Sequence, residues 1–141
     1  MTEHASRPAG DSHVELTQLM EVTDANVLGN VHGGVLMRLA DTAAALAAIR
    51  HSGGPCVTVS VDEMVFREPV HVGDLVTFRA SVNDVGTTSL ECGVRIDAER
   101  LNTGETVHAS TAYFVYVAID DEGHPRPVPP IEVSTPEEIR R

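Results

Sequence analysis

Gly33, Gly34 and Asp41 have the types and the spacing to carry out chemistry on a carbonyl group. The two glycines stand at the expected beginning of a helix, where backbone N–H groups have no intrahelical partner and the helix dipole favours negative charge. Such a helix start can bind a carbonyl oxygen as it becomes an oxyanion. Asp41 follows seven residues later among apolar residues, and an ionised aspartate in that setting indicates a functional carboxylate.

Both features also have structural explanations. Paired glycines allow close packing of a helix on a sheet. Asp41 could be a structural carboxylate bonded to a hydroxyl group such as that of Thr42 or Thr58. The combination of the glycines and the carboxylate in one helix favours function. Two polar residues in the preceding turn could add a side-chain donor to the oxyanion site, namely Asn26 and His32.

The spacing of Gly34 and Asp41 predicts a site shared between two copies of the chain. Seven residues turn a helix by about 700° and advance it by roughly 10 Å, so the two residues share a face but lie far apart along the axis. One small carbonyl group cannot lie close to both. We therefore expect an obligatory two-fold dimer in which one subunit provides the glycine turn and its partner provides Asp41.

The helix that carries Asp41 is expected to begin near Gly33 or Gly34 and to end at about Arg50. Its sequence is apolar almost all round, which is typical of a helix wrapped by protein. Arg50 and His51 stand at its C-terminal end, where cations complement the helix dipole. We interpret them as end caps rather than as ligand contacts.

The rest of the folded chain is predicted to be strand. Residues 14–22 have a mixed apolar pattern that favours a strand. After Pro55, apolar and polar residues alternate in the runs 57–62, 76–82 and 90–97. The run 106–119 is apolar at both parities near its end, as expected for a strand covered on both sides. The connections between these later strands are too short for crossover helices, which predicts a largely antiparallel sheet. One buried helix must then pack on this sheet.

The length of 141 residues suits one domain. We expect a flexible leader over residues 1–12, a folded domain over residues 13–120 and a Pro-rich extended tail over residues 121–141. The N-terminus has no apolar segment of the secretory type, and no apolar run reaches the length of a membrane span. The expected location is therefore cytoplasmic, with no membrane partner.

The composition excludes several classes of function. A net charge of −11 argues against nucleic-acid binding. All ten basic residues are Arg, which removes Schiff-base and P-loop lysine chemistry. The seven His residues do not cluster at metal-ligand spacing, so no metal is expected. Cys56 and Cys92 lack the short paired spacing of metal or redox sites and are interpreted as buried free thiols.

The motifs of this chain resemble those of the hot dog fold acyl-CoA thioesterases of the cytosolic acyl-CoA hydrolase type. The resemblance covers residues 14–129. It rests on Asp24-Ala-Asn26-x-x-Gly29, His32-Gly33-Gly34, Asp41, Val59-x-Val61-Asp62-x-Met64-x-Phe66-x-x-Pro69-Val70-x-Val72-Gly73-Asp74, Val85-Gly86-x-x-Ser89, Phe114-Val115-x-Val117 and Pro127-Val128-Pro129. It implies an α+β hot dog fold, in which an antiparallel five- or six-stranded sheet wraps around one long central helix. It also implies a homodimer as the minimal unit and a hexamer built as a trimer of dimers.

The resemblance further implies hydrolysis of acyl-CoA to free acid and CoA, without a cofactor beyond the CoA of the substrate. Matched by position, Asp41 is the general base or nucleophile and Asn26 reaches in from the opposing subunit, while the amides of Gly33 and Gly34 polarise the thioester. The implied substrate contacts are His32 and the turn that touches CoA, formed by Gly86, Thr87, Thr88 and Ser89. That turn often carries a basic residue in the family, which this chain lacks. Met64 and Phe66 either line an acyl tunnel or belong to the core.

Three other functions remain open from the sequence. The asparagine, glycine, histidine and aspartate positions are shared with aryl-CoA thioesterases of the phenylacetyl-CoA type. A non-catalytic acyl-CoA-binding protein of the same fold would also keep them. A hydratase or dehydratase is disfavoured because those enzymes need a paired acid and base, and His32 is the only histidine in the core motif.

Overall fold

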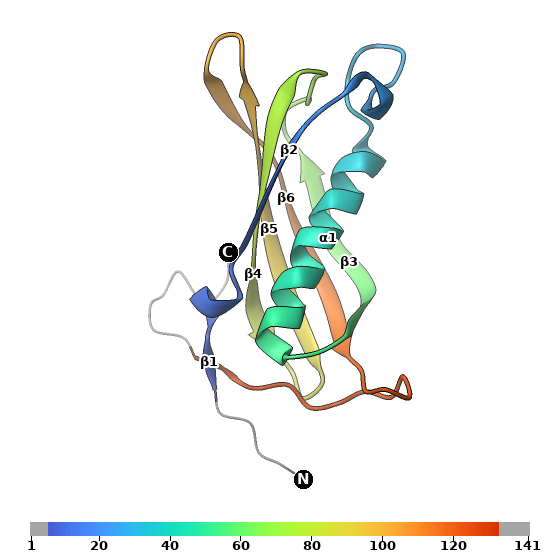
Figure 1. Ribbon diagram of the computed structural model, residues 1–141, viewed down its shortest axis with the longest axis vertical. Helices are drawn as coiled ribbons and strands as arrows, with labels where there is room; N and C mark the ends of the chain where they lie inside the picture. Colours follow the sequence, from blue (N-terminus) through green and yellow to red (C-terminus); the bar gives the residue numbers. More distant parts are fainter. Residues whose placement is uncertain (1–5, 133–141) are drawn as a thin grey trace.

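A single long helix lies against one face of a five-stranded antiparallel sheet in the computed structural model, which describes residues 6–132 (Figure 1). The helix is α1 (Gly33–Ser52). The strands lie in the order β2 (Val14–Leu19), β4 (Asp74–Val85), β5 (Ser89–Arg100), β6 (Glu105–Ala118) and β3 (Cys56–Phe66). The predicted hot dog arrangement is thereby confirmed, with β2 and β3 as the two edges of the sheet.

Helix α1 packs on the sheet through a face built mainly from alanine. Its buried apolar side chains are Leu36, Leu39, Ala40, Ala43, Ala44, Ala47 and Ala48. Alanine has no side chain beyond Cβ, so the helix lies close to the apolar side chains of β4 and β5. The helix ends at Gly53, whose φ of 79° is the left-handed conformation that favours glycine.

The opposite face of α1 is open in the single chain. Met37, Leu46 and Ile49 are 39%, 44% and 39% exposed. The expectation of a helix wrapped all round is therefore wrong for one protomer, because the sheet covers one side of the helix only. Its apolar character on the open side indicates a second protein surface.

Strand β3 forms an edge of the sheet and is exposed along almost its whole length. Val57, Val59, Val61 and Val65 are between 41% and 54% exposed. The predicted alternation of a solvent-exposed face with a buried face is not seen in β3. The strand pairs only with β6, and its register shifts twice. A long apolar edge strand invites pairing with another chain.

The two ends of the described chain meet. Strand β1 (Arg7–Pro8) pairs in parallel with β7 (Ile131–Glu132), and two short 3-10 helices, η1 (Ala9–Ser12) and η2 (Val22–Asp24), flank β2. Ser12 is buried and its hydroxyl accepts a 2.9 Å hydrogen bond from the amide of Val82. Residues 7–12, expected to be a flexible leader, thus have a defined structure. Arg7–Pro8 pair with β7 in a separate two-stranded sheet, and Ser12 is bonded to β4. The remaining parts of that leader and of the expected tail, residues 1–5 and 133–141, lie outside the described residues.

None of the helices described within residues 6–132 is both long enough and apolar enough to cross a membrane.

His51 anchors the segment that follows β6 to the end of α1. It is 2% exposed, and its Nε2 donates a 2.7 Å hydrogen bond to the carbonyl of Pro129. Its Nδ1 is buried without a partner among the described residues, which assigns the neutral tautomer with the proton on Nε2. Desolvation by burial lowers the pKa of His51, a shift that the hydrogen bond to Pro129 partly opposes.

A histidine with a lowered pKa in the folded state makes the protein less stable in acid. The unfolded chain takes up a proton below about pH 6.5, which the native His51 resists, so the free energy of unfolding falls as the pH drops. We expect this decline in denaturant titrations from pH 8 to pH 5. It should be weaker in His51→Gln, which keeps a donor for the Pro129 carbonyl. Equal pH dependence in the two proteins would contradict the assignment.

Candidate active site

The N-terminus of α1 is a glycine turn without a side-chain cap. His32 occupies the N-cap position, its side chain makes no capping hydrogen bond, and its carbonyl accepts from the amide of Val35 at 3.0 Å. Among the described residues, no group accepts a hydrogen bond from the amides of Gly33 and Gly34. The first turn of a 20-residue helix therefore presents unused N–H donors.

The space around the glycines tests whether packing requires them. A Cβ at Gly33 would lie 3.4 Å from Phe66 Cζ, at the limit of ordinary van der Waals contact with the end of a side chain, so packing does not by itself account for that glycine. Nothing outside the helix lies within 4 Å of the position that a Cβ of Gly34 would take. Packing within the protomer does not require glycine at position 34. A cavity of about 400 Å³ opens beside this turn, lined among others by Gly33, Leu36, Phe66 and Arg67.

Asn26 organises the loop before the helix. Its Oδ1 accepts hydrogen bonds from the amides of Leu28 (2.9 Å) and Asn30 (3.2 Å). These two hydrogen bonds fix which end of the carboxamide is the oxygen, and they use both of its lone pairs. The Nδ2 group is therefore the part of the side chain that can bind another molecule. Asn26 is half-buried, and its predicted contact in the opposing subunit would use that donor.

Asp41, half-buried near the middle of α1, is held from the sheet by two hydroxyl groups. Its Oδ1 accepts a 2.9 Å hydrogen bond from Thr58 on β3 and a 2.5 Å hydrogen bond from the phenol of Tyr116 on β6. Of the two hydroxyl partners considered from the sequence, Thr58 is the one used, since Thr42 donates instead to the carbonyl of Arg38. Thr58 and Tyr116 lie directly opposite one another in the β3–β6 pairing.

Tyr116 is the site residue that sequence reasoning missed. Its side chain is fully buried, and burial raises the pKa of its phenol far above the ordinary value, as does the hydrogen bond to Asp41. The only signal in the sequence is a tyrosine in an apolar run, and a buried tyrosine usually finds a partner for its hydroxyl. The identity of that partner depends on strand register, which no local pattern shows.

The remaining predicted contacts lie at two ends of the molecule. The turn formed by Gly86, Thr87, Thr88 and Ser89 joins β4 to β5 near the C-terminal end of α1, where the carbonyl of Thr88 accepts from the amide of Ala118 at 2.9 Å. A 20-residue helix is about 30 Å long, so this turn is far from the glycine turn of the same protomer. Phe66 borders the glycine turn, and Met64 packs against the core.

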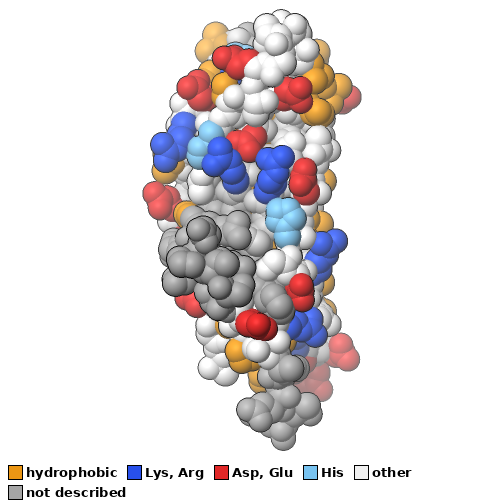
Figure 2. Space-filling model, turned by 90° about the vertical axis from the view of Figure 1, so that its left-hand side faces the viewer, with side chains coloured by type: hydrophobic (Ala, Val, Ile, Leu, Met, Phe, Trp, Pro, Cys, Tyr) orange, Lys and Arg blue, Asp and Glu red, His pale blue; other side chains and the backbone are white. Residues whose placement is uncertain are grey.

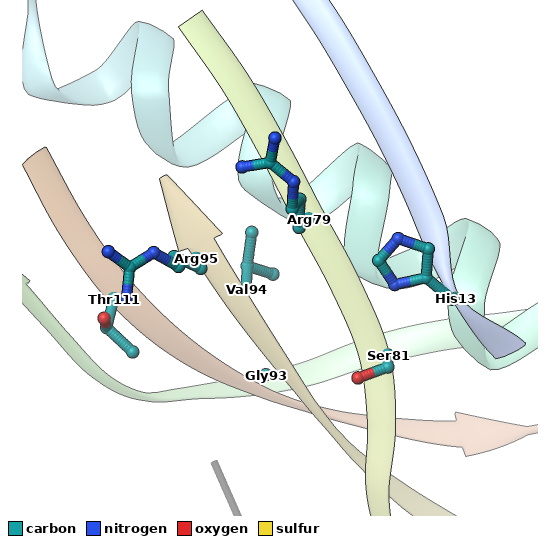
Figure 3. A pocket seen from close by; sticks show the side chains of 7 residues that line it. All are labelled: His13, Arg79, Ser81, Gly93, Val94, Arg95 and Thr111. Carbon is teal, nitrogen blue, oxygen red and sulfur yellow. The ribbon is translucent and has the colours of Figure 1, made fainter. Parts of the chain in front are cut away.

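A second hollow, of about 290 Å³, lies on the side of the sheet away from α1 (Figure 3). Arg79 and Arg95 line it, and both pair with Asp97, at 2.9 and 3.1 Å. Figure 2 shows that side of the molecule, where Arg and His side chains lie among Asp and Glu side chains. Because its two guanidinium groups are already paired and none of the predicted site residues lies there, we do not place the site in this hollow.

Within residues 6–132, no group of three or more His, Cys, Asp or Glu side chains is arranged to hold a metal ion. The candidate site described above consists of backbone amides, one carboxylate and two hydroxyl groups.

One long helix with an open N-terminus and a carboxylate at mid-helix, packed against one face of a five-stranded antiparallel sheet, defines a hot dog fold protein. The family model described as "Thioesterase superfamily" matches residues 28–105. The chain belongs to the thioesterase superfamily.

Named relatives and solved structures agree with this assignment. The chain is 36% identical over 132 residues to the acyl-CoA thioester hydrolase YciA of Salmonella typhimurium, which covers 92% of this chain and 98% of that protein. It is similar to an apo-hexameric acyl-CoA thioesterase, with a TM-score of 0.91, 36% identity, and 95% and 86% of the two chains covered.

A third similar protein is the acyl-CoA hydrolase of Staphylococcus aureus, solved with butyryl-CoA, CoA and CoA disulfide. Its TM-score is 0.87 at 31% identity, with 93% and 80% of the two chains covered. Structures of that enzyme also exist with an aspartate, an asparagine or a threonine replaced by alanine.

The raised pKa of Tyr116 predicts that its phenol stays protonated for as long as the chain is folded. The test uses Tyr113→Phe, in which Tyr116 is the only tyrosine left. Above about pH 10 the unfolded chain loses a phenol proton that the native state keeps, so stability falls as the pH rises. Near-ultraviolet tyrosinate absorbance should therefore appear only together with unfolding seen by circular dichroism. Reversible ionisation near pH 10 in folded protein would contradict the burial of this group.

Proposed function

We propose that this protein is an acyl-CoA thioesterase that hydrolyses acyl-CoA to free acid and CoA at a site shared by two subunits. The observation that carries the proposal is the pairing, on one helix, of an uncapped glycine start with a carboxylate held by two hydroxyl groups. A thioester carbonyl is an activated electrophile with a good leaving thiolate. One oxyanion site and one carboxylate are therefore enough for its hydrolysis.

The proposed roles follow from the chemistry of the groups. The amides of Gly33 and Gly34 donate to the thioester oxygen as negative charge develops on it. Asp41 of the other subunit either takes a proton from the water that attacks the carbonyl carbon or attacks that carbon itself to give an anhydride that water then hydrolyses. In both routes the carbon–sulfur bond breaks and CoA leaves as the thiolate. The chemistry needs no cofactor beyond the CoA of the substrate.

Relatives support the substrate class. The similar proteins named above are acyl-CoA thioester hydrolases, and the S. aureus enzyme binds butyryl-CoA and CoA. The residue types replaced in the S. aureus variants, an aspartate, an asparagine and a threonine, are those of Asp41, Asn26 and Thr58 in the proposed site.

The structure supports a particular geometry for the dimer. Gly33 lies beside Phe66, and Asp41 lies beside Thr58, on the same exposed edge strand β3. A partner's glycine turn meets Asp41 only if the partner's β3 runs antiparallel with its position 66 opposite position 58. The two-fold axis of such a pairing passes close to Asp62, midway between these positions and near the centre of β3 (Cys56–Phe66).

This pairing would also cover what the single chain leaves open. It removes the free edge of β3 and brings the exposed side chains of α1, Met37, Leu46 and Ile49, towards the partner helix. It further brings the glycine turn of one subunit nearer to the Gly86–Ser89 turn of the other, so that an extended CoA can reach from that turn to the thioester. The proposed substrate contacts are His32, near the thioester, and Met64 and Phe66, along the acyl group. Assembly of three dimers into a hexamer is proposed from the hexameric relative.

The first test is release of CoA from a panel of thioesters, acetyl-CoA to palmitoyl-CoA plus phenylacetyl-CoA, by wild type and Asp41→Asn. Removal of the proposed base or nucleophile should lower kcat by about 100-fold or more. Blanks without substrate correct for reaction of the thiol reagent with Cys56 and Cys92. Asp121→Asn, at an exposed carboxylate outside the site, is the matched control and should retain full activity.

The panel also separates the rival functions. Preference for phenylacetyl-CoA would assign an aryl-CoA thioesterase. Absence of turnover on every thioester, with binding seen by calorimetry, would replace the enzyme by an acyl-CoA-binding protein. Equal slow rates for wild type and Asp41→Asn would show that the carboxylate is structural.

The proposed dimer geometry predicts a specific cross-link. A cysteine introduced by Asp62→Cys should form an intersubunit disulfide under mild oxidation, since residues at a two-fold axis between antiparallel strands have Cα atoms about 4.5 to 5.5 Å apart. Non-reducing electrophoresis would show a covalent dimer. Thr106→Cys, exposed on β6 away from the edge, should give no covalent dimer under the same conditions. The reverse pattern would rule out this register of β3 pairing.

A further inference from the structure

We propose that Tyr116 is a positioning residue for Asp41, which fixes Oδ1 so that Oδ2 is the oxygen that acts on the substrate. The inference rests on the proposed function and goes beyond it, because it names the reacting atom and the group that selects it. It follows from the hydrogen bonds of the two carboxylate oxygens.

The two oxygens of Asp41 have different surroundings. Oδ1 accepts from Tyr116 at 2.5 Å and from Thr58 at 2.9 Å. Oδ2 accepts no hydrogen bond from any residue between positions 6 and 132. An oxygen that already accepts two hydrogen bonds is a poorer base and nucleophile than one that accepts none. Since Asp41 is only half-buried, Oδ2 is the oxygen left for water or a thioester.

The phenol of Tyr116 is committed to Asp41. Its hydroxyl lies 2.5 Å from Oδ1 and 2.9 Å from the backbone carbonyl of the same residue. A fully buried hydroxyl group costs free energy unless it is hydrogen-bonded. Both of its acceptors belong to Asp41, so the phenol also ties the carboxylate to its own helix turn and restricts rotation of the side chain.

The sheet gives this contact its rigidity. Tyr116 lies on β6, between its partner strands β5 and β3, and pairs with Leu90 on one side and Thr58 on the other. A donor on a central strand moves less than one on an edge. Thr58 stands on the edge strand β3, so Tyr116 is the more firmly placed of the two donors.

The charged and titratable groups near this cluster come from three elements. Tyr116 faces Asp41 from β6, and Cys92 faces Tyr116 from β5, where burial raises the pKa of the thiol and keeps it neutral. Arg38 lies one turn before Asp41 on the exposed side of α1. The phenol is therefore the titratable group in direct contact with the carboxylate.

The experiment compares Tyr116→Phe with Tyr113→Phe in CoA release. The two tyrosines stand three residues apart on β6 and on opposite faces of the sheet, so Tyr113→Phe is a matched loss of one phenol hydroxyl. Tyr116→Phe should lower kcat by about 10- to 100-fold, the effect of losing one hydrogen bond to a charged group, and leave KM within about threefold. Tyr113→Phe should match wild type in both.

Different outcomes overturn different claims. Inactive wild type would remove the proposed function. Active wild type with inactive Asp41→Asn, but with an unchanged kcat in Tyr116→Phe, would overturn the positioning role alone. A lower melting temperature with kcat and KM unchanged would assign Tyr116 to the core only.

A second variant keeps the test decisive if Tyr116→Phe does not fold. Nonsense suppression can place 3-fluorotyrosine, whose phenol is more acidic and a stronger donor, at position 116 or at position 113. The stronger hydrogen bond should change kcat, at an unchanged KM, at position 116 only. Identical kinetics for the two proteins would refute the proposal.

Discussion

The distance between Gly34 and Asp41 on one rigid helix is the constraint on which the rest of the molecule depends. A rise of 1.5 Å per residue keeps the open amides and the carboxylate roughly 10 Å apart, and α1 is continuous from Gly33 to Ser52 without a kink residue. No movement within the protomer can close that gap. The exposed edge of β3 and the open face of α1 are the surfaces through which a second subunit would close it.

The parts of the fold that could be predicted from sequence are those that local patterns determine. Apolar periodicity located α1 and the strands, and the glycines located its beginning, because these signals come from residues near one another in the chain. The helix ran two residues beyond the predicted end, to Ser52, as helix boundaries depend on the capping conformation of Gly53.

The parts that could not be predicted depend on register between distant segments. Tyr116 and Asp41 are 75 residues apart, and they meet because Thr58 and Tyr116 are paired across β3 and β6. The same limit explains why the structure of residues 7–12 was not predicted. Arg7–Pro8 pair with Ile131–Glu132, at the other end of the described chain. Asn26 shows a further limit of sequence reasoning. Its Oδ1 accepts hydrogen bonds from amides of its own loop, a structural role that the motif alone does not reveal.

The alanine face of α1 has an evolutionary consequence. Ala40, Ala43, Ala44, Ala47 and Ala48 are completely buried, and a larger side chain at any of them would force the helix away from the sheet, at a cost of about 1 to 3 kcal/mol. Such a displacement would also part Asp41 from Tyr116. The alanines of this face thus limit which substitutions the chain can accept without altering the geometry of the carboxylate.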